Sequence, residues 1–368
     1  MAVVWIPSQD HISNSNLKKF TDFVAENTGK DFKSYDDLHH FSISDPEFWR
    51  YVIEFCGAKG DWKGPVYEGE NIIAAKWFPK SSLNFAENIL KNRSDDEALI
   101  FRCEDRFSDR LSFAELYNQV SRTAQHLKLV GVTKGDRVVG FLPNFAGSIV
   151  AMLATVSVGA IWSSCSPDFG EQGVIDRFGQ IEPKVLFCVD GYFYNGKSHN
   201  CLGKIKSFTA RLPTLKQVVL FDYASLNNIS IDNSISYQEI VDNYEPNEID
   251  FERVGFDHPL YIMYSSGTTG VPKCIVHGHG GTLIQHLKEH QLQTNISVGD
   301  RVFYFTTCSW MMWNWLVSAL GTGATIMLYD GSPTYPDDIV LWKFADEEQF
   351  SHFGTSAKYI ETLMKNDV

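Results

Sequence analysis

The stretch YIMYSSGTTGVPK, residues 261–273, sets the interpretation of the whole sequence. Leu260 to Tyr264 is a short apolar, β-branched and aromatic run, which predicts a buried strand. Six small residues follow, four of them hydroxylated: Ser265, Ser266, Gly267, Thr268, Thr269 and Gly270. Pro272 then restricts the backbone and removes one N–H donor, and Lys273 adds a cation. The sequence therefore predicts a strand that runs into a glycine- and hydroxyl-rich loop closed by a lysine.

A loop of this composition suits a polyphosphate. Glycines let backbone N–H groups approach phosphate oxygens, hydroxyl groups add donors, and a lysine supplies a point charge. The Walker pattern G-x-x-x-x-G-K-[ST] does not fit, because Gly267 and Gly270 are three residues apart and Cys274 follows Lys273. A polar turn that joins two strands is the alternative, and six such residues in a row count against it.

The same stretch resembles the signature phosphate loop of the adenylate-forming enzymes, the superfamily of acyl-CoA synthetases, peptide-synthetase adenylation domains and luciferases. Residues 266–273 match its pattern, Ser-Gly-Thr-Thr-Gly-x-Pro-Lys, at each fixed position. The resemblance implies that a carboxylate attacks MgATP to give an acyl-adenylate and pyrophosphate, and that coenzyme A then displaces AMP. It implies that the ATP phosphates are bound by Ser265, Ser266, Gly267, Thr268, Thr269, Gly270 and Lys273.

Composition limits the classes of function. The 368 residues carry a net charge of −13 and no basic run, which argues against a nucleic-acid surface and against binding to an anionic membrane. An anionic substrate such as ATP would then need a local cationic site or Mg²⁺. The seven cysteines are scattered without C-x-x-C or metal-ligand spacing, so a zinc site and a disulfide framework are both poor interpretations. They predict reduced, mostly buried thiols in a cytoplasmic protein.

A membrane interpretation rests on residues 138–167, which carry no charge. Pro143, Asn144, Gly147, Gly159 and five serines interrupt this stretch. A buried strand, turn, helix and second strand explain it better than a bilayer span, so a transport function is remote.

The chain begins irregularly and then becomes regular. Residues 1–95 are rich in aromatic side chains, with helices expected at 17–24 and 46–55. The side chains expected to anchor this extension are Trp5, Phe20, Phe41, Phe48, Trp49, Trp77, Phe78 and Phe85. From Ala98 strands and helices alternate, which predicts an α/β fold with mostly parallel sheets flanked by helices. The resemblance implies that residues 96–368 are part of an AMP-binding (adenylation) domain.

Individual elements follow from local signals. A capping box at Ser112 and Glu115 begins a helix that should end at Gly131, and helices are expected at 146–157 and 168–180. Strands are expected at 98–102, 137–142, 159–164, 185–189 and 218–221. Residues 191–197 predict a polar loop and residues 227–257 an acidic surface connection without activity. Later helices are expected at 282–294, 341–348 and 356–364, and strands at 300–305, 321–328 and 351–354.

Four histidines after the loop raise a metal hypothesis: His277, His279, His286 and His290. His286 and His290 have the i, i+4 spacing that can bind zinc on a helix, but no acidic residue completes an H-E-x-x-H motif. Solvated or packing histidines are the favoured interpretation, and no metal site is assigned.

The string WMMWNW at 310–315 is either core or the wall of an acyl pocket, because aromatic and methionine side chains shape small apolar cavities. It resembles the acetoacetyl-CoA synthetase version of the superfamily, as does the turn at 330–338, while residues 77–90 resemble a segment that acetyl- and acetoacetyl-CoA synthetases carry before their main domain. That resemblance implies an acyl pocket formed by Trp310, Met311 and Met312. Acetate or propionate remains an open alternative to acetoacetate as the small carboxylate substrate.

The later family motifs are missing from this sequence. No aromatic-Gly-x-Thr-Glu segment, Thr-Gly-Asp or C-terminal catalytic lysine is found. The resemblance therefore implies the N-terminal portion of an adenylating ligase, incomplete at its C-terminal end and incompetent to turn over alone. A truncated, non-catalytic binding or regulatory relative is the alternative. The catalytic residues and the oligomeric state stay unassigned.

Overall fold

A seven-stranded sheet forms the centre of the computed structural model, which describes residues 5–226, 230–265 and 270–368. Every neighbouring pair in this sheet is parallel except β14 and β15, which are antiparallel. The strands, in spatial order, are β12 (Ser234–Ser236), β11 (Gln217–Phe221), β8 (Val185–Val189), β6 (Arg137–Phe141), β7 (Ile161–Cys165), β14 (Pro259–Tyr264) and β15 (Cys274–Gly278). The expected strand before the loop is therefore present as β14.

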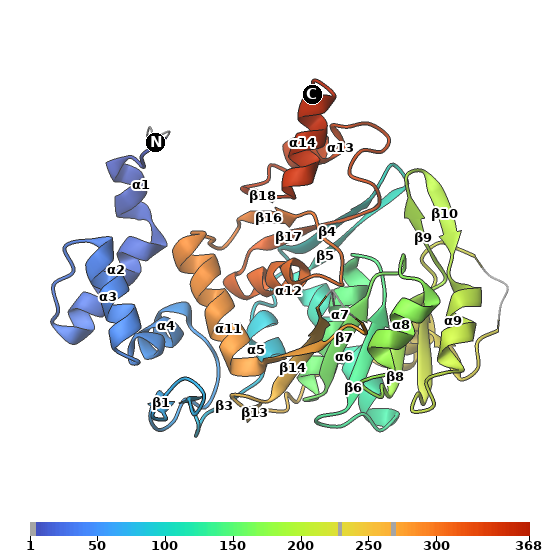
Figure 1. The fold of residues 1–368 in the computed structure, drawn as a ribbon, viewed down its shortest axis with the longest axis horizontal. Helices are drawn as coiled ribbons and strands as arrows, with labels where there is room; N and C mark the ends of the chain where they lie inside the picture. Colours follow the sequence, from blue (N-terminus) through green and yellow to red (C-terminus); the bar gives the residue numbers. More distant parts are fainter. Residues whose placement is uncertain (1–4, 227–229, 266–269) are drawn as a thin grey trace.

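A second, five-stranded sheet lies beside the first (Figure 1). Its order is β18 (His352–Gly354), β16 (Arg301–Tyr304), β17 (Thr325–Asp330), β4 (Glu97–Cys103) and β5 (Phe107–Ser112), and only β4 and β5 run antiparallel. Three two-stranded pairs complete the strands: β1 (Tyr67–Glu68) with β2 (Lys76–Trp77), β3 (Ser82–Leu83) with β13 (Val254–Gly255), and β9 (Gly191–Tyr194) with β10 (Lys197–Asn200). The expectation of mostly parallel sheets is confirmed.

Helices cover both sheets, as expected for crossover connections. The body contains α5 (Phe85–Ile89), α6 (Phe113–Leu129), α7 (Ala146–Ser157), α8 (Glu171–Phe178), α9 (Leu202–Thr209), α10 (Tyr237–Asn243), α11 (His279–Lys288), the π-helix η1 (Glu289–Gln293), α12 (Met311–Ser318), the 3₁₀-helix η2 (Ala319–Thr322), α13 (Val340–Glu347) and α14 (Ala357–Lys365). The capping box of α6 is formed as predicted, because Ser112 Oγ accepts from Glu115 N and Glu115 Oε2 from Ser112 N.

The uncharged stretch 138–167 contains β6, α7 and β7. All twelve residues of α7 are buried, which explains why this helix has no charged face. In the part of the chain that the structure describes, no helix combines the length and the apolar character that crossing a bilayer requires. The interpretation of this stretch as buried strand, helix and strand is confirmed.

Two local expectations are wrong. Residues 191–197 do not form a polar loop but belong to the β9–β10 hairpin, where Tyr192 and His199 stack with ring centroids 4.7 Å apart. Residues 227–257 contain β12, α10 and β13, with 227–229 outside the described residues. Both errors arise because polar sequences lack a periodic apolar signal, while cross-strand pairing and capping supplied by the rest of the fold order them.

The N-terminal residues form four helices, α1 (Gln9–Asn14), α2 (Asn16–Thr28), α3 (Tyr35–Ser44) and α4 (Phe48–Cys56), at the left of Figure 1. Phe20 lies at the centre of their aromatic packing, with ring centroids 5.6 Å from Phe48 and 5.3 Å from Phe55. Phe78 and Phe85 are buried in the same core cluster as the sheets. Trp5 is not an anchor as expected, because 70% of its surface is exposed.

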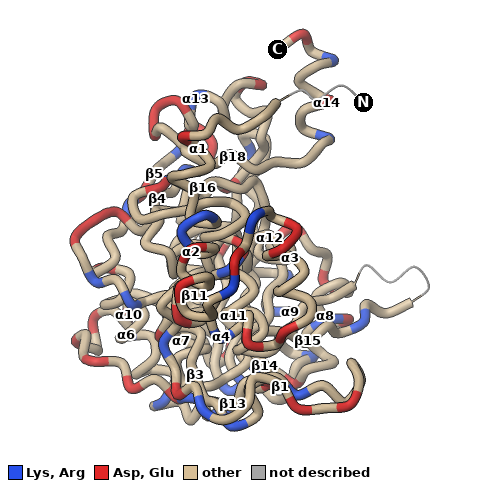
Figure 2. The backbone as a smooth tube through the Cα atoms, turned by 90° about the vertical axis from the view of Figure 1, so that its left-hand side faces the viewer, with Lys and Arg blue, Asp and Glu red and all other residues tan. Residues whose placement is uncertain are grey.

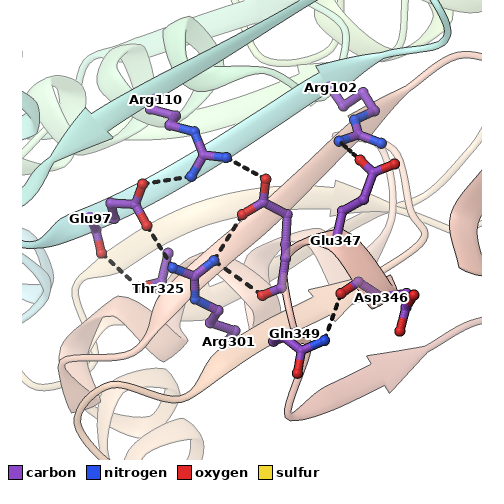
Figure 3. Close-up of polar contacts among 9 residues, drawn as sticks. Glu97, Arg102, Arg110, Arg301, Thr325, Asp346, Glu347 and Gln349 are labelled. Atoms are coloured by element: carbon purple, nitrogen blue, oxygen red, sulfur yellow. Dashed lines mark hydrogen bonds and ion pairs between the residues drawn. The ribbon is translucent and has the colours of Figure 1, made fainter. Parts of the chain in front are cut away.

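An ion-pair network ties the strands of the five-stranded sheet together (Figure 3). Glu97 on β4 pairs with Arg110 on β5 at 2.6 Å and with Arg301 on β16 at 2.7 Å. Glu348, buried after α13, contacts both arginines, at 2.8 Å for Arg301. Elsewhere, acidic and basic residues are interspersed along the chain (Figure 2).

Candidate active site

The predicted phosphate loop is the connection between β14 and β15. Tyr264 and Cys274 are paired across these strands, and Ser265 and Lys273 close the loop just beyond them. Ser265 N donates to Lys273 O at 3.0 Å, and Lys273 N donates to Ser265 Oγ at 3.3 Å. Ser266, Gly267, Thr268 and Thr269 lie outside the described residues. The loop does join two strands, as the alternative interpretation held, so its chemistry and not its position favours phosphate binding.

The side chain of Lys273 is exposed, and Gly270, three residues earlier, is exposed as well. Among the ion pairs of the described residues, Lys273 has none. A lysine that is free of an internal carboxylate keeps its charge available for an anionic ligand.

The expected acyl-pocket residues open helix α12. Trp310 is the N-cap residue and is 66% exposed, whereas Met311 and Met312 are partly buried. Met311 reaches β14, since its Sδ lies 4.0 Å from Tyr261 Oη. The structure therefore brings Met311 to the strand that leads into the phosphate loop. Trp313, by contrast, is fully buried and belongs to the core.

The start of α12 is held against the first sheet by a polar turn. Trp313 Nε1 donates to Asn144 Oδ1 at 3.0 Å, and Asn144 Nδ2 lies 3.4 Å from the carbonyl oxygens of Thr306 and Tyr329. Ser164 Oγ donates to Cys308 O at 2.7 Å. These bonds position the segment after β16 beside the ends of β6 and β7, so α12 has a defined place relative to both sheets.

A cavity of about 420 Å³ lies at the carboxyl ends of β7, β16 and β17. Its lining includes Asp168, Thr307 and Asp330, and the stacked rings of Tyr192 and His199 from the hairpin. In open α/β sheets, ligands bind at the carboxyl ends of the parallel strands. β14 is parallel to β7, so the phosphate loop leaves the sheet at this same edge. Sequence reasoning missed this cavity, because its residues are distant in the chain.

Asp330 is the most perturbed acid of the cavity. Burial raises the pKa of its carboxyl to about 7, with the neighbouring Glu104 carboxylate adding to the effect. Tyr223 Oη donates to Asp330 Oδ2 at 2.7 Å, which opposes the shift. Glu104 in turn accepts from the backbone N–H groups of Asn195, Gly196 and Ser332, and so fastens the hairpin to the turn after β17.

The four histidines have different surroundings. His279 Nδ1 accepts from Phe85 N at 3.3 Å, and His290 Nε2 lies 3.0 Å from Trp315 O. Burial lowers the pKa of His279 and His290 to about 3 and that of His286 to about 4, so these imidazoles are neutral. Over residues 5–226, 230–265 and 270–368, no group of three or more His, Cys, Asp or Glu side chains is arranged to hold a metal ion. The contacts of His279 with the start of α5 and of His290 with Trp315 are those of packing histidines.

Comparison with known proteins supplies the family. The sequence profile of the family described as AMP-binding enzyme matches residues 85–368, more than half of the chain. The chain belongs to the AMP-binding enzyme family. An acetoacetyl-coenzyme A synthetase of Rhizobium meliloti is 47% identical over 366 residues, which are 98% of this chain and 56% of the relative. An acetoacetyl-CoA synthetase of Gallus gallus is 43% identical, over 100% of this chain and 56% of the relative.

A solved structure of this family shares the fold. Acetoacetyl-CoA synthetase from Streptomyces lividans superimposes with a TM-score of 0.94 at 40% sequence identity. The alignment covers 99% of this chain and 57% of that one. The AMP-binding enzyme fold expected from the sequence is therefore present, and the chain spans just over half the length of these relatives.

Proposed function

We propose that this chain supplies the ATP- and acid-binding part of a ligase that activates acetoacetate to acetoacetyl-CoA. The main support is its similarity, along nearly its whole length, to proteins named acetoacetyl-CoA synthetase. Two features of the chain itself support the same assignment: the composition of the β14–β15 loop and the half-buried methionines at the start of α12. Acetate or propionate activation remains the alternative.

In the proposed reaction, the acid's carboxylate attacks the α-phosphorus of ATP, pyrophosphate leaves, and the thiol of coenzyme A then displaces AMP. Mg²⁺ neutralises phosphate charge in such a transfer. The phosphate oxygens are bound in this proposal by Ser265, Gly270 and Lys273. Four further loop residues that lie outside the described residues bind them as well: Ser266, Gly267, Thr268 and Thr269. Lys273 offsets the charge of the leaving pyrophosphate, because its ammonium has no internal carboxylate partner among the described residues.

The acid occupies the space beside α12 in this proposal, with Trp310, Met311 and Met312 around its acyl end. Met311 contacts Tyr261 on β14, four residues before Ser265. A carboxylate held near the loop would thus have its apolar end toward α12. The cavity of about 420 Å³ at the carboxyl ends of β7, β16 and β17 offers room for part of a second organic substrate.

The remaining assignments are parts of the same proposal. Residues 1–95 are an N-terminal extension and residues 96–368 the adenylation-domain part. A role in the use of ketone bodies and in fatty-acid metabolism follows from the proposed substrate. A cytoplasmic location agrees with the seven free cysteines, six of which are buried.

Two measurements on the purified chain test the function. Calorimetric titration with MgATP and then acetoacetate should show binding of both, and ATP–pyrophosphate exchange should be absent because the later sequence motifs are missing. Exchange that depends on acetoacetate would also support the ligase and would make those motifs dispensable. Failure to bind MgATP, or equal binding of acetate and acetoacetate, would contradict the proposal.

A further inference from the structure

The end of helix α8 contacts the chain on both sides of the β14–β15 loop. The guanidinium of Arg177, in the last turn of α8, lies 5.7 Å from the ring centroid of Tyr264, the last residue of β14. Gln180, two residues after the helix, donates from Nε2 to Pro272 O at 2.9 Å. The first contact is made before the loop and the second at its exit, so α8 is positioned to fix the two ends relative to each other.

The amide of Gln180 is fully engaged although the residue is exposed. Besides its bond to Pro272, Nε2 donates to Asp176 O in α8 at 2.5 Å. Oε1 lies 3.8 Å from Cys274 Sγ, where it can accept from the weak thiol donor. Holding a long exposed side chain in one rotamer costs entropy, which these three contacts offset. Gln180 therefore joins α8 to Pro272 and Cys274, the two neighbours of Lys273 in the chain.

The segment that carries Gln180 is itself anchored to the sheet. The next residue, Ile181, is buried. Arg137, at the start of β6, donates from Nε to Ile181 O at 2.5 Å and from Nη2 to Glu182 O at 3.0 Å. Because β6 is the middle strand of the seven-stranded sheet, Gln180 holds the loop exit from a fixed base.

The exit of the loop has little other support. β15 is the last strand of its sheet and pairs only with β14. The side chains of Ile275 and Val276 are about half exposed, so packing holds this strand weakly. Among the hydrogen bonds of the described residues, only those of Gln180 join residues 270–274 to a part of the chain outside β14, β15 and their connection.

We infer that Gln180 is a positioning residue for ATP, which holds Pro272 and Cys274 and thereby fixes the direction in which the Lys273 side chain leaves the backbone. The inference rests on the proposed function and deepens it. Gln180 acts through Lys273 and makes no contact with the nucleotide itself. Without this amide, the ligand would have to order the loop exit as it binds, and that ordering weakens its affinity.

The test is calorimetric titration of the full 368-residue chain with MgATP. Gln180→Leu should weaken MgATP binding about three- to tenfold, the range expected for the loss of one or two hydrogen bonds. Its urea midpoint should equal that of the parent chain, because the residue is exposed. In the Lys273→Met background, Gln180→Leu should weaken binding by less than about twofold, since the group through which it acts is gone. A merely structural role would lower the urea midpoint and leave the affinity of the folded chain unchanged.

Gln172→Leu is the matched control on the same helix. Gln172 is also exposed, and its Nε2 donates to Asp176 Oδ1 at 2.6 Å, away from the loop. This variant should bind MgATP as tightly as the parent chain. Gln180→Asn is a second test variant, because its shorter side chain keeps an amide but withdraws it from Pro272 O, and it should behave like Gln180→Leu.

The outcomes separate the inference from the proposed function. Parent-like MgATP affinity in both Gln180 variants would overturn the inference, as would equal losses from Gln180→Leu with and without the Lys273 side chain. Failure of the parent chain to bind MgATP, or an unchanged affinity in Lys273→Met, would instead count against the proposed function.

Discussion

At the residue scale, the backbone and the side chain of Lys273 have separate roles in the loop that the sequence predicts to bind phosphate. The backbone of Lys273 is held by Ser265 through two hydrogen bonds, while its side chain is exposed. Substitution of this side chain should therefore change ligand binding without changing the fold.

Lys273→Met should weaken MgATP binding about 10- to 100-fold, which corresponds to about 1.4–2.7 kcal/mol for a charge-assisted contact. Its free energy of unfolding should stay within about 0.5 kcal/mol of the parent chain, as for most surface substitutions. Calorimetric titration with MgATP and urea denaturation measure the two effects. Lys365→Met on α14 is the control, since this exposed lysine pairs only with Glu361. Equal MgATP affinity in the Lys273 variant and the control would refute the role of Lys273.

At the scale of elements, the ion-pair network keeps the strand that precedes α12 in place. Glu348 contacts Arg110 on β5 and Arg301 on β16. Glu97 on β4 contacts the same two arginines (Figure 3). Thr325, at the start of β17, donates to Glu97 O at 2.7 Å. Charged side chains thus join β4, β5 and β16, and the Thr325 hydroxyl adds β17.

Glu348→Ala should destabilise the chain by about 2 kcal/mol, because it leaves the partly buried Arg301 and the exposed Arg110 with one carboxylate between them. Glu361→Ala, which breaks only exposed pairs on α14, should cost less than about 1 kcal/mol. Urea denaturation of both variants provides the comparison. Similar losses in the two would mean that the network behaves as ordinary surface pairs.

At the scale of the whole molecule, buried titratable groups make stability depend on pH in two directions. The pKa of Asp330 is raised to about 7 by burial, so the folded chain keeps a proton that the unfolded chain releases above its usual value of 3.8. Stability therefore falls as pH rises from about 4 to about 7. The buried histidines have lowered pKa values and act in the opposite direction: the unfolded chain binds protons at these imidazoles first, so the stability of the fold decreases as pH falls below 6.5.

Asp330→Asn should remove the first effect while keeping an acceptor for Tyr223. Relative to the parent chain, the variant should gain about 3 kcal/mol of stability between pH 5 and pH 8, and the histidine contributions cancel in this difference. Urea denaturation at the two pH values gives the result. Asp346→Asn, at an exposed position, should show no such change. A pH-independent difference for Asp330→Asn would mean that this carboxyl has an ordinary pKa.

The sequence by itself determined the alternation of strands and helices, the capping of α6, and the strand and loop chemistry at 260–273. These features depend on residues close together in the chain, such as Ser112 with Glu115 or the run before Ser265, so local periodicity and composition are sufficient. The match to a family pattern added ATP, Mg²⁺ and coenzyme A as expected ligands.

Only the tertiary structure decided the rest. The cavity beside Asp330 joins strand ends of two sheets, and the β9–β10 hairpin is ordered by Glu104 from far along the chain. Trp5, expected to be an anchor, is exposed, while Trp313 in the same kind of apolar sequence is buried. Burial and raised pKa values depend on neighbours in space, and those neighbours are set by packing that no short stretch of sequence encodes.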